Sequence, residues 1–288
     1  MKHMQDCYTL QNGVLIPRMA FGTYKTAEGD GTAVIRTAIE AGYRSFDTAS
    51  FYGTEACLGQ AIRESGVPRE AFFVASKVWK TEMGYAGTKA AFQRSLERLK
   101  MSYLDLYLIH WPRPSLEEPD WRTLDSETWR AMEELYRAGK VRAIGVSNFL
   151  PHHMENLLQR GTIAPMAAQL EYHPGYIQAA AVQYCRERQI QVQAWSPMVR
   201  GRVLQDPLLL ELADRYQVSP AQICLRFAVQ EGVIPLPKAS TMERMRENLD
   251  IFSFAITQED MYRLETMPQI GWSGEHPDRE RVYFQPRQ

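Results

Sequence analysis

The sequence lacks several features that define whole classes of protein. Its 288 residues include four cysteines and no CxxC pair, so neither a zinc framework nor a disulfide ladder is indicated, and reduced thiols are expected. No stretch approaches ~18 uninterrupted apolar residues, and the first ten residues contain no apolar run. We therefore expect no secretory leader, no membrane span and a cytoplasmic location.

The chain also has almost no net charge. Its 33 Lys and Arg against 34 Asp and Glu give a net charge of -1, which provides no field to attract nucleic acid or an anionic membrane. It contains no close repeat, no low-complexity tract and no Ser/Gly-rich linker. With 45% hydrophobic and 23% charged residues, the composition predicts one globular domain over 1–288 and a small-molecule partner.

Short apolar runs alternate with longer segments of helical period, which is the pattern of a βα repeat. Eight runs are expected as strands: 18–22, 44–47, 72–77, 104–110, 141–147, 166–170, 191–195 and 233–236. Helices are expected between them, among others at 32–41, 54–65, 88–99, 127–138 and 152–159. Eight strands are the number that a closed barrel needs, so the sequence predicts an α/β fold with a single (β/α)8 barrel.

Both ends of the chain carry patterns of their own. Asn12-Gly13 lies between two short extended runs, which is typical of a hairpin with a two-residue turn. Such an N-terminal β-hairpin could plug the amino-terminal end of the barrel. At the other end, the tail from Gly271 is expected to be irregular.

Polar residues stand where three predicted strands end. Asp47, Lys77 and His110 end successive runs, and Tyr52 follows Asp47 by five residues. The carboxyl ends of barrel strands form the active face, so we expect the four side chains to converge there. Taken singly, they are explained as well by a helix cap, a surface aromatic, a snorkelling lysine and a core histidine. Their joint placement is what indicates chemistry.

This set of side chains suits proton donation to a carbonyl oxygen. Tyrosine has a pKa near 10, and a lysine ~4 Å away is expected to lower the pKa of Tyr52 by up to roughly three units, an effect that Asp47 partly offsets. His110 could orient the carbonyl oxygen through a hydrogen bond. No cluster of His and carboxylate ligands stands out, so no metal is expected.

Three segments then resemble the aldo-keto reductase family, in the family's order. They are GYRSFDTASFYGTEACLG at 42–59, KVRAIGVSNF at 140–149, preceded by YLDLYLIHWP, and LPKASTMERMRENLD near the C-terminus. The sequence is most similar to a microbial and protozoan branch that contains 2,5-diketo-D-gluconate reductases, glyoxal reductases and prostaglandin F synthases. The resemblance implies reduction of an aldehyde or ketone by NADPH, with NADH also possible. In that reaction Tyr52 is the general acid, Lys77 lowers its pKa, Asp47 pairs with Lys77, and His110 positions the substrate.

The resemblance also implies how the cofactor binds. A GxGxxG fingerprint is absent, which fits, because this family does not hold its dinucleotide in a Rossmann unit. The carboxamide would be held by Ser147, Asn148 and Gln169, and the nicotinamide ring would stack on Trp195. The pyrophosphate would lie under Ser196, Pro197, Met198 and Gly201, and the 2′-phosphate would bind Lys238 and Arg244. Further dinucleotide positions are Gly22, Thr23, Asp47, Ser240, Thr241 and Asn248.

Two residues depart from the family pattern. Ala239 stands where a Ser or Thr usually follows the phosphate lysine, and Ala168 stands where an Asn commonly precedes the glutamine. Each removes a polar group near the dinucleotide. A weaker preference for NADPH over NADH is expected.

Aromatic residues resemble the substrate walls of the family and suit flat or hydrophobic carbonyls: Tyr24, Phe51, Trp79 and Trp111, beside His110. The Pro-rich loop 112–125 or the tail around Trp272 could act as a lid. We expect a monomer. Two other interpretations stay open, a nicotinamide-binding regulatory subunit with little turnover and an unrelated barrel enzyme.

Overall fold

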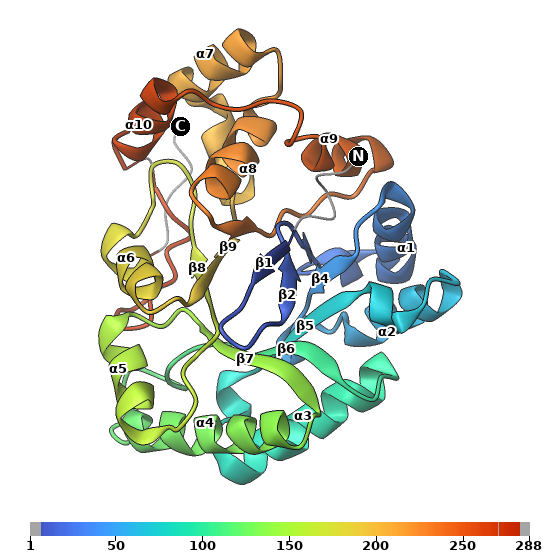
Figure 1. The fold of residues 1–288 in the computed structure, drawn as a ribbon, viewed down its shortest axis with the longest axis vertical. Coiled ribbons are helices and arrows are strands. Elements are labelled where there is room, and N and C mark those ends of the chain that lie inside the picture. The colour runs from blue at the N-terminus through green and yellow to red at the C-terminus, as the bar shows by residue number, and fades with distance from the viewer. Residues whose placement is uncertain (1–6, 270, 283–288) are drawn as a thin grey trace.

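The computed structural model describes residues 7–269 and 271–282, and its centre is a parallel sheet of eight strands (Figure 1). The strands follow one another around the sheet in chain order. They are β3 (Phe21–Gly22), β4 (Ser45–Asp47), β5 (Phe73–Val78), β6 (Leu104–Ile109), β7 (Val141–Ser147), β8 (Ala167–Glu171), β9 (Gln191–Trp195) and β10 (Ile234–Pro235). Each lies at or within a predicted run, to within one residue, so the eight strand predictions are confirmed.

Hydrogen bonds beside the first and last strands close the ring. The amide of Ala20 donates to the carbonyl of Pro235 at 3.2 Å, and the amide of Gly22 donates to that of Pro237 at 3.0 Å. All six residues of β5 and all six of β6 are buried, as expected for strands covered on both faces. The predicted (β/α)8 barrel is confirmed.

Helices surround the strands on all sides (Figure 1). They are α1 (Gly31–Ala41), α2 (Glu55–Glu64), α3 (Tyr85–Leu99), α4 (Trp121–Arg137), α5 (Pro151–Arg160), α6 (Ala179–Glu187), α7 (Pro207–Tyr216), α8 (Pro220–Gln230), α9 (Met242–Leu249) and α10 (Gln258–Glu265). The five helices predicted by range correspond to α1 to α5. Short 3-10 helices include η3 (Ser50–Tyr52) and η6 (Val199–Gln205).

Helix α4 begins six residues before its predicted start. Trp121, Asp125, Thr128 and Trp129 are all buried, and their spacing places them on one helical face. Residues 121–125, expected as part of a lid loop, are therefore the first turn of this helix. Burial of Trp121, whose ring lies against His152 and His153 of α5, outweighs the loop-like composition of the preceding segment.

The N-terminal hairpin forms from β1 (Cys7–Thr9) and β2 (Leu15–Pro17). Five residues separate the strands, and the hydrogen bond between Leu10 and Val14 limits the loop itself to three residues, 11–13, and not two. The amide of Leu10 donates to the carbonyl of Val14, and that of Gly13 donates to the carbonyl of Leu10. Gly13 has φ 83°, the left-handed conformation that ends such a loop. The two-residue turn was therefore wrong, although its glycine was placed correctly.

The hairpin lies across the middle of the barrel in Figure 1. The side-chain amide of Gln11 donates to the carbonyl of Arg188 at 2.9 Å, just before β9. The side-chain amide of Asn12 donates to the carbonyl of Arg142, near the start of β7, also at 2.9 Å. Because these contacts lie at the amino ends of the strands, the hairpin covers the end of the barrel opposite the polar strand ends.

The C-terminal segment 271–282 contains no helix or extended strand, as expected for the tail from Gly271. A single bridge between His276 and Arg279 is its only regular pairing in the described residues. Within the same described ranges, no helix is both long enough and apolar enough to cross a membrane.

Candidate active site

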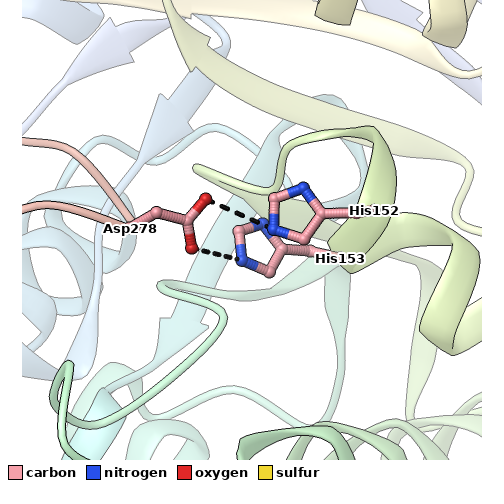
Figure 2. Close-up of side chains that lie close together, drawn as sticks. All are labelled: His152, His153 and Asp278. Carbon is pink, nitrogen blue, oxygen red and sulfur yellow. Dashed lines mark hydrogen bonds and ion pairs between the residues drawn. The ribbon is translucent and has the colours of Figure 1, made fainter.

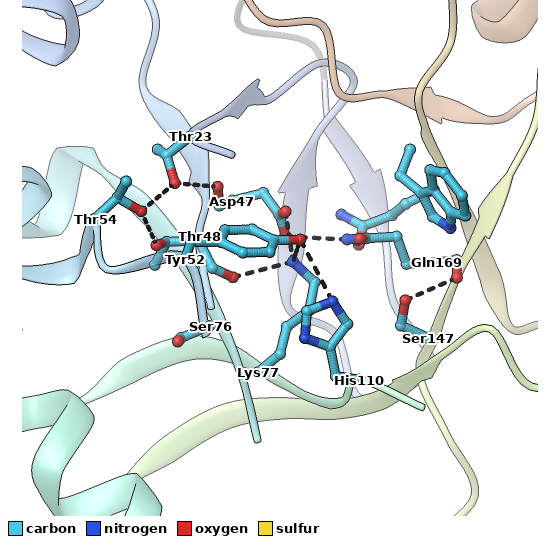
Figure 3. A network of polar contacts seen from close by, with 12 residues as sticks. Thr23, Asp47, Thr48, Tyr52, Thr54, Ser76, Lys77, His110, Ser147 and Gln169 are labelled. Atoms are coloured by element: carbon cyan, nitrogen blue, oxygen red, sulfur yellow. Dashed lines mark hydrogen bonds and ion pairs between the residues drawn. The ribbon is translucent and has the colours of Figure 1, made fainter. Parts of the chain in front are cut away.

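Four of the predicted side chains meet at the carboxyl end of the barrel. Asp47 ends β4, Lys77 is the last but one residue of β5, His110 follows β6, and Tyr52 ends η3. The phenol oxygen of Tyr52 lies 3.4 Å from Lys77 Nζ and 3.4 Å from His110 Nε2, and Lys77 Nζ donates to Asp47 Oδ1 at 2.6 Å (Figure 3). The structure thus brings the four together as the sequence predicts.

The protonation of Tyr52 differs from the expectation. Desolvation raises the pKa of its phenol well above 10, and the negative charge of Asp47 adds to the effect. The lysine was expected to lower this pKa. Its ammonium, however, is bound to the Asp47 carboxylate, so the positive charge near the phenol is largely balanced. Tyr52 therefore keeps its proton at neutral pH.

The other two ionisable groups are also shifted by burial. Burial lowers the pKa of Lys77, and the adjacent Asp47 carboxylate opposes that shift. Burial lowers the pKa of His110 well below 6.5, and the charges of Lys77 and Lys80 add to it. His110 is therefore a neutral imidazole at physiological pH.

The tautomer of His110 follows from its surroundings. Nδ1 is buried and has no hydrogen-bond partner among the described residues, while Nε2 faces the Tyr52 hydroxyl. A buried N–H without an acceptor costs more than a buried lone pair without a donor. The proton therefore sits on Nε2, which leaves an N–H directed toward the cavity.

Three threonines form a hydrogen-bond network that supports the tetrad. Thr23 donates its hydroxyl to the carbonyl of Asp47 at 3.0 Å, and the Thr54 hydroxyl lies 2.9 Å from that of Thr23 and 2.8 Å from that of Thr48. The carbonyl of Thr48 accepts from Lys77 Nζ at 3.0 Å. Thr23, expected to touch the dinucleotide, is fully buried in this network and positions the strand end (Figure 3).

The predicted nicotinamide residues are joined to one another and to the tetrad. Asn148 donates to the carbonyl of His110 at 3.0 Å and accepts from Trp195 Nε1 at 2.8 Å. It has φ 64°, a left-handed conformation that asparagine tolerates better than most residues. Gln169 Nε2 donates to Asp47 Oδ2 at 3.0 Å. These bonds fix the Trp195 ring and the tetrad as one unit.

A cavity of about 1030 Å³ extends from the tetrad, at the carboxyl end of the barrel, to helix α9. All five predicted substrate residues line it. So do most of the predicted cofactor residues: Gly22, Asp47, Ser147, Asn148, Gln169, Trp195, Ser196, Pro197, Met198, Gly201, Lys238, Arg244 and Asn248. Ser240 and Thr241 lie beside its walls, where Ser240 accepts from Lys238 and Thr241 caps α9.

The shape and the donors of this cavity fit a dinucleotide. Gly22 has no side chain to narrow it, and a Cβ there would lie 3.2 Å from the carbonyl oxygen of Leu236. At the far end, Lys238 and Arg244 supply the cations that a phosphate needs. The neutral amides of Asn148 and Gln169 stand at the opposite end, beside the tetrad.

The cavity wall also includes residues that the sequence did not assign to the cofactor or the substrate. The loop residues 113–117 and the tail residues 275–277 and 279–281 contribute to it, together with Lys25, Glu28, Lys80, Arg200 and Glu247. Only the loop and the tail had a pattern that indicated a lid. The charged residues gave no such pattern, because isolated surface charges carry no periodicity.

The barrel and its Tyr, Lys, Asp and His side chains define an oxidoreductase site of a known class. The sequence profile of the Aldo/keto reductase family matches residues 18–268, and the chain belongs to this family. It is 44% identical over 276 residues to the glyoxal reductase of Bacillus subtilis, and the alignment covers 96% of this chain and 97% of that protein.

Two further relatives bear on the site. The 9,11-endoperoxide prostaglandin H2 reductase of Trypanosoma cruzi is 42% identical over 277 residues, with 95% of each chain covered. A solved structure of an aldo-keto reductase complexed with NADPH superposes with a TM-score of 0.85 at 31% identity, covering 96% of this chain and 90% of that one.

Proposed function

We propose that this protein is an NADPH-dependent reductase that converts aldehydes or ketones to alcohols within a single barrel domain. The observation that carries the proposal is the position of the Tyr52 hydroxyl, 3.4 Å from both Lys77 Nζ and His110 Nε2, at one end of a cavity that reaches Lys238 and Arg244. A protonated phenol in such a place can donate to a carbonyl oxygen.

Each side chain of the tetrad has a defined part in this reaction. When bound, NADPH supplies the hydride that adds to the carbonyl carbon. Tyr52 gives its phenol proton to the carbonyl oxygen, and the adjacent Lys77 ammonium stabilises the phenolate that is left. His110 donates its Nε2 proton in a hydrogen bond to the same oxygen and so orients the substrate. Asp47 keeps Lys77 charged and in place.

The residues that would hold NADPH lie along the cavity. Ser147, Asn148 and Gln169 offer polar groups for the carboxamide, and the half-buried Trp195 offers its ring. Lys238 and Arg244 would bind the 2′-phosphate, which NADH lacks. We propose NADPH as the main cofactor, with NADH accepted less well, since Ala239 provides no hydroxyl beside Lys238.

The substrate end is aromatic. The Phe51 and Trp79 rings are stacked with centroids 3.9 Å apart, and Tyr24 lies against Tyr52 with centroids 5.0 Å apart. Such walls favour flat or hydrophobic carbonyl compounds. The names of two relatives, a glyoxal reductase and a prostaglandin H2 reductase, support a range from small dicarbonyls to larger oxygenated lipids. We further propose that the enzyme is a cytoplasmic monomer.

The test is a spectrophotometric assay with NADPH and with NADH. Methylglyoxal, phenylglyoxal and 4-nitrobenzaldehyde are offered to wild type, Tyr52→Phe and the matched control Tyr262→Phe, which alters an exposed tyrosine. We expect Tyr52→Phe to lose at least about 100-fold in turnover while still binding NADPH, and the control to be unaffected. No oxidation of NADPH with any carbonyl, or full activity of Tyr52→Phe, would overturn the proposal.

A further inference from the structure

The C-terminal strap, residues 271–282, crosses the cavity wall and is fastened at one end. Glu171, at the carboxyl end of β8, accepts from both the amide and the hydroxyl of Ser273 at 2.7 Å. Beyond this point the strap folds back on itself, because the amide of Val282 donates to the carbonyl of Gly274. The segment between these bonds contains the residues that line the cavity.

The second fastening is a single carboxylate, Asp278. It lies 3.1 Å from His153 Nε2 and 3.2 Å from His152 Nε2, and it also accepts from Arg113 Nη2. Figure 2 shows its two oxygens facing the edges of the two imidazole rings. Both histidines are in the first turn of α5, where the helix dipole favours a negative charge. The strap is thus tied to the loop 113–117 through Arg113.

Two histidines and a carboxylate so close together also resemble a metal site. The hydrogen bonds instead favour a direct contact between the histidines and the Asp278 carboxylate, with no metal ion between them. Nδ1 of His153 accepts from the amide of Leu150 at 3.1 Å, so the proton of this neutral ring is on Nε2. A metal would need the lone pair of that nitrogen. It would also sit beside the Arg113 guanidinium and the positive end of α5.

The charge of Arg113 also acts on a second carboxyl group, that of Asp125, whose pKa it lowers. Asp125 is fully buried, and neither of its oxygens has a hydrogen-bond partner among the described residues. The Arg113 guanidinium lies 5.4 Å above the ring of Trp121, one helical turn before Asp125 on the same face of α4. Its Nε is buried and likewise has no partner within those residues.

We propose that Arg113 is a two-position side chain that controls access to the substrate end of the cavity. Bound to Asp278, it holds the strap across the cavity; bound to Asp125, it leaves Asp278 with only the His152 and His153 contacts, so that this part of the strap opens more readily. Burial raises the pKa of Asp125 well above its usual range, and the charge of Arg113 opposes this, so an approaching guanidinium favours the charged carboxylate that would receive it. The motion is independent of the proposed reductase activity, and only its effect on turnover rests on that activity.

Hydrogen-deuterium exchange of the strap amides in the cofactor-free protein tests the two positions separately. Asp278→Asn removes the charge that binds Arg113 and the two histidines, which destabilises the closed position, and it is expected to raise exchange by at least about tenfold, the effect of one charge-assisted hydrogen bond. Asp125→Asn removes the open position and is expected to lower exchange by about tenfold. The exposed Asp214→Asn in α7 is the matched control and should change nothing.

A Tm measurement on each variant shows that the barrel is folded. The exchange rates of the two variants are then compared with that of wild type. Opposite shifts for Asp278→Asn and Asp125→Asn support the two positions. Shifts in the same direction, or no shift for Asp125→Asn, overturn them. One-to-one binding of Zn²⁺ that is lost in His153→Ala would assign the cluster to a metal and overturn the proposal as well.

Turnover supplies an independent readout. Asp278→Asn should lower the KM of a bulky quinone such as 9,10-phenanthrenequinone by several-fold while leaving that of methylglyoxal unchanged, because only the larger substrate needs the strap to move. Equal KM changes for both would contradict control of access. If wild type oxidises NADPH with neither carbonyl, the proposed function fails, while the exchange experiment still decides the motion.

Discussion

Replacing Asp47 by Asn tests the most deeply buried ion pair of the site. Lys77 is 0% exposed and Asp47 is 4% exposed, and their Nζ and Oδ1 atoms are 2.6 Å apart. The variant leaves the lysine with the Thr48 carbonyl and the Tyr52 hydroxyl as partners. Breaking a buried pair in this way costs about 3–5 kcal/mol. In a domain of this size that corresponds to a fall in Tm of roughly 6–20 °C.

The double variant and the pH dependence sharpen this test. Asp47→Asn combined with Lys77→Met should be more stable than Asp47→Asn alone, because no uncompensated charge remains. In the single variant the pKa of Lys77 should fall further below its ordinary value of 10.5, since the opposing carboxylate is gone. The unfolded chain then binds a proton that the folded chain does not, so the stability of this variant should rise with pH over a wider range than in wild type.

Thermal unfolding followed by circular dichroism at several pH values gives the stability of wild type, of Asp47→Asn and of the double variant. Glu127→Gln, which removes the exposed ion pair with Arg130 in α4, is the matched control and should leave the Tm nearly unchanged. The reasoning would be refuted if Asp47→Asn lost no more stability than this control. A double variant less stable than the single one would refute it equally.

Three further results are expected. Arg244→Ala should raise the KM for NADPH far more than that for NADH in steady-state assays, and equal effects would exclude a contact with the 2′-phosphate. Carbonyl reduction should be independent of pH from about pH 6 to pH 8, because the lowered pKa of His110 keeps it neutral and the raised pKa of Tyr52 keeps it protonated there, so a titration in this range would contradict both states. Gly145→Ala should lower stability by about 1–3 kcal/mol in urea unfolding, since an added Cβ would lie 2.3 Å from the carbonyl oxygen of Ala167.

The barrel could be predicted from the sequence because its strands are short buried runs with distinct ends. Details that depend on packing could not. The early start of α4 follows from the burial of Trp121, which no local propensity reveals. The hairpin loop gained a third residue because Gly13, rather than the Asn12-Gly13 pair, takes the left-handed conformation in the turn.

In the site, residue identity could be predicted but protonation could not. The ends of the strands placed Asp47, Lys77 and His110 together, since parallel strands end at the same edge. The pKa of Tyr52 depends on how far its hydroxyl is removed from water and on how closely Asp47 balances the lysine, and both are properties of the folded chain. The attachment of Asp278 to α5 spans 125 residues and has no local pattern in the sequence.

The N-terminal hairpin has a consequence for how this protein folds while it is being synthesised. The Tyr8 hydroxyl donates to the carbonyl of Val229, 221 residues later, and Gln11 donates to Arg188, 177 residues later. The hairpin is therefore synthesised long before the residues that it docks against. Contacts this distant in the chain slow folding and leave apolar surface uncovered in the meantime. Ile16, fully buried in the finished protein, would stay exposed on the nascent chain until the later strands and helices are made.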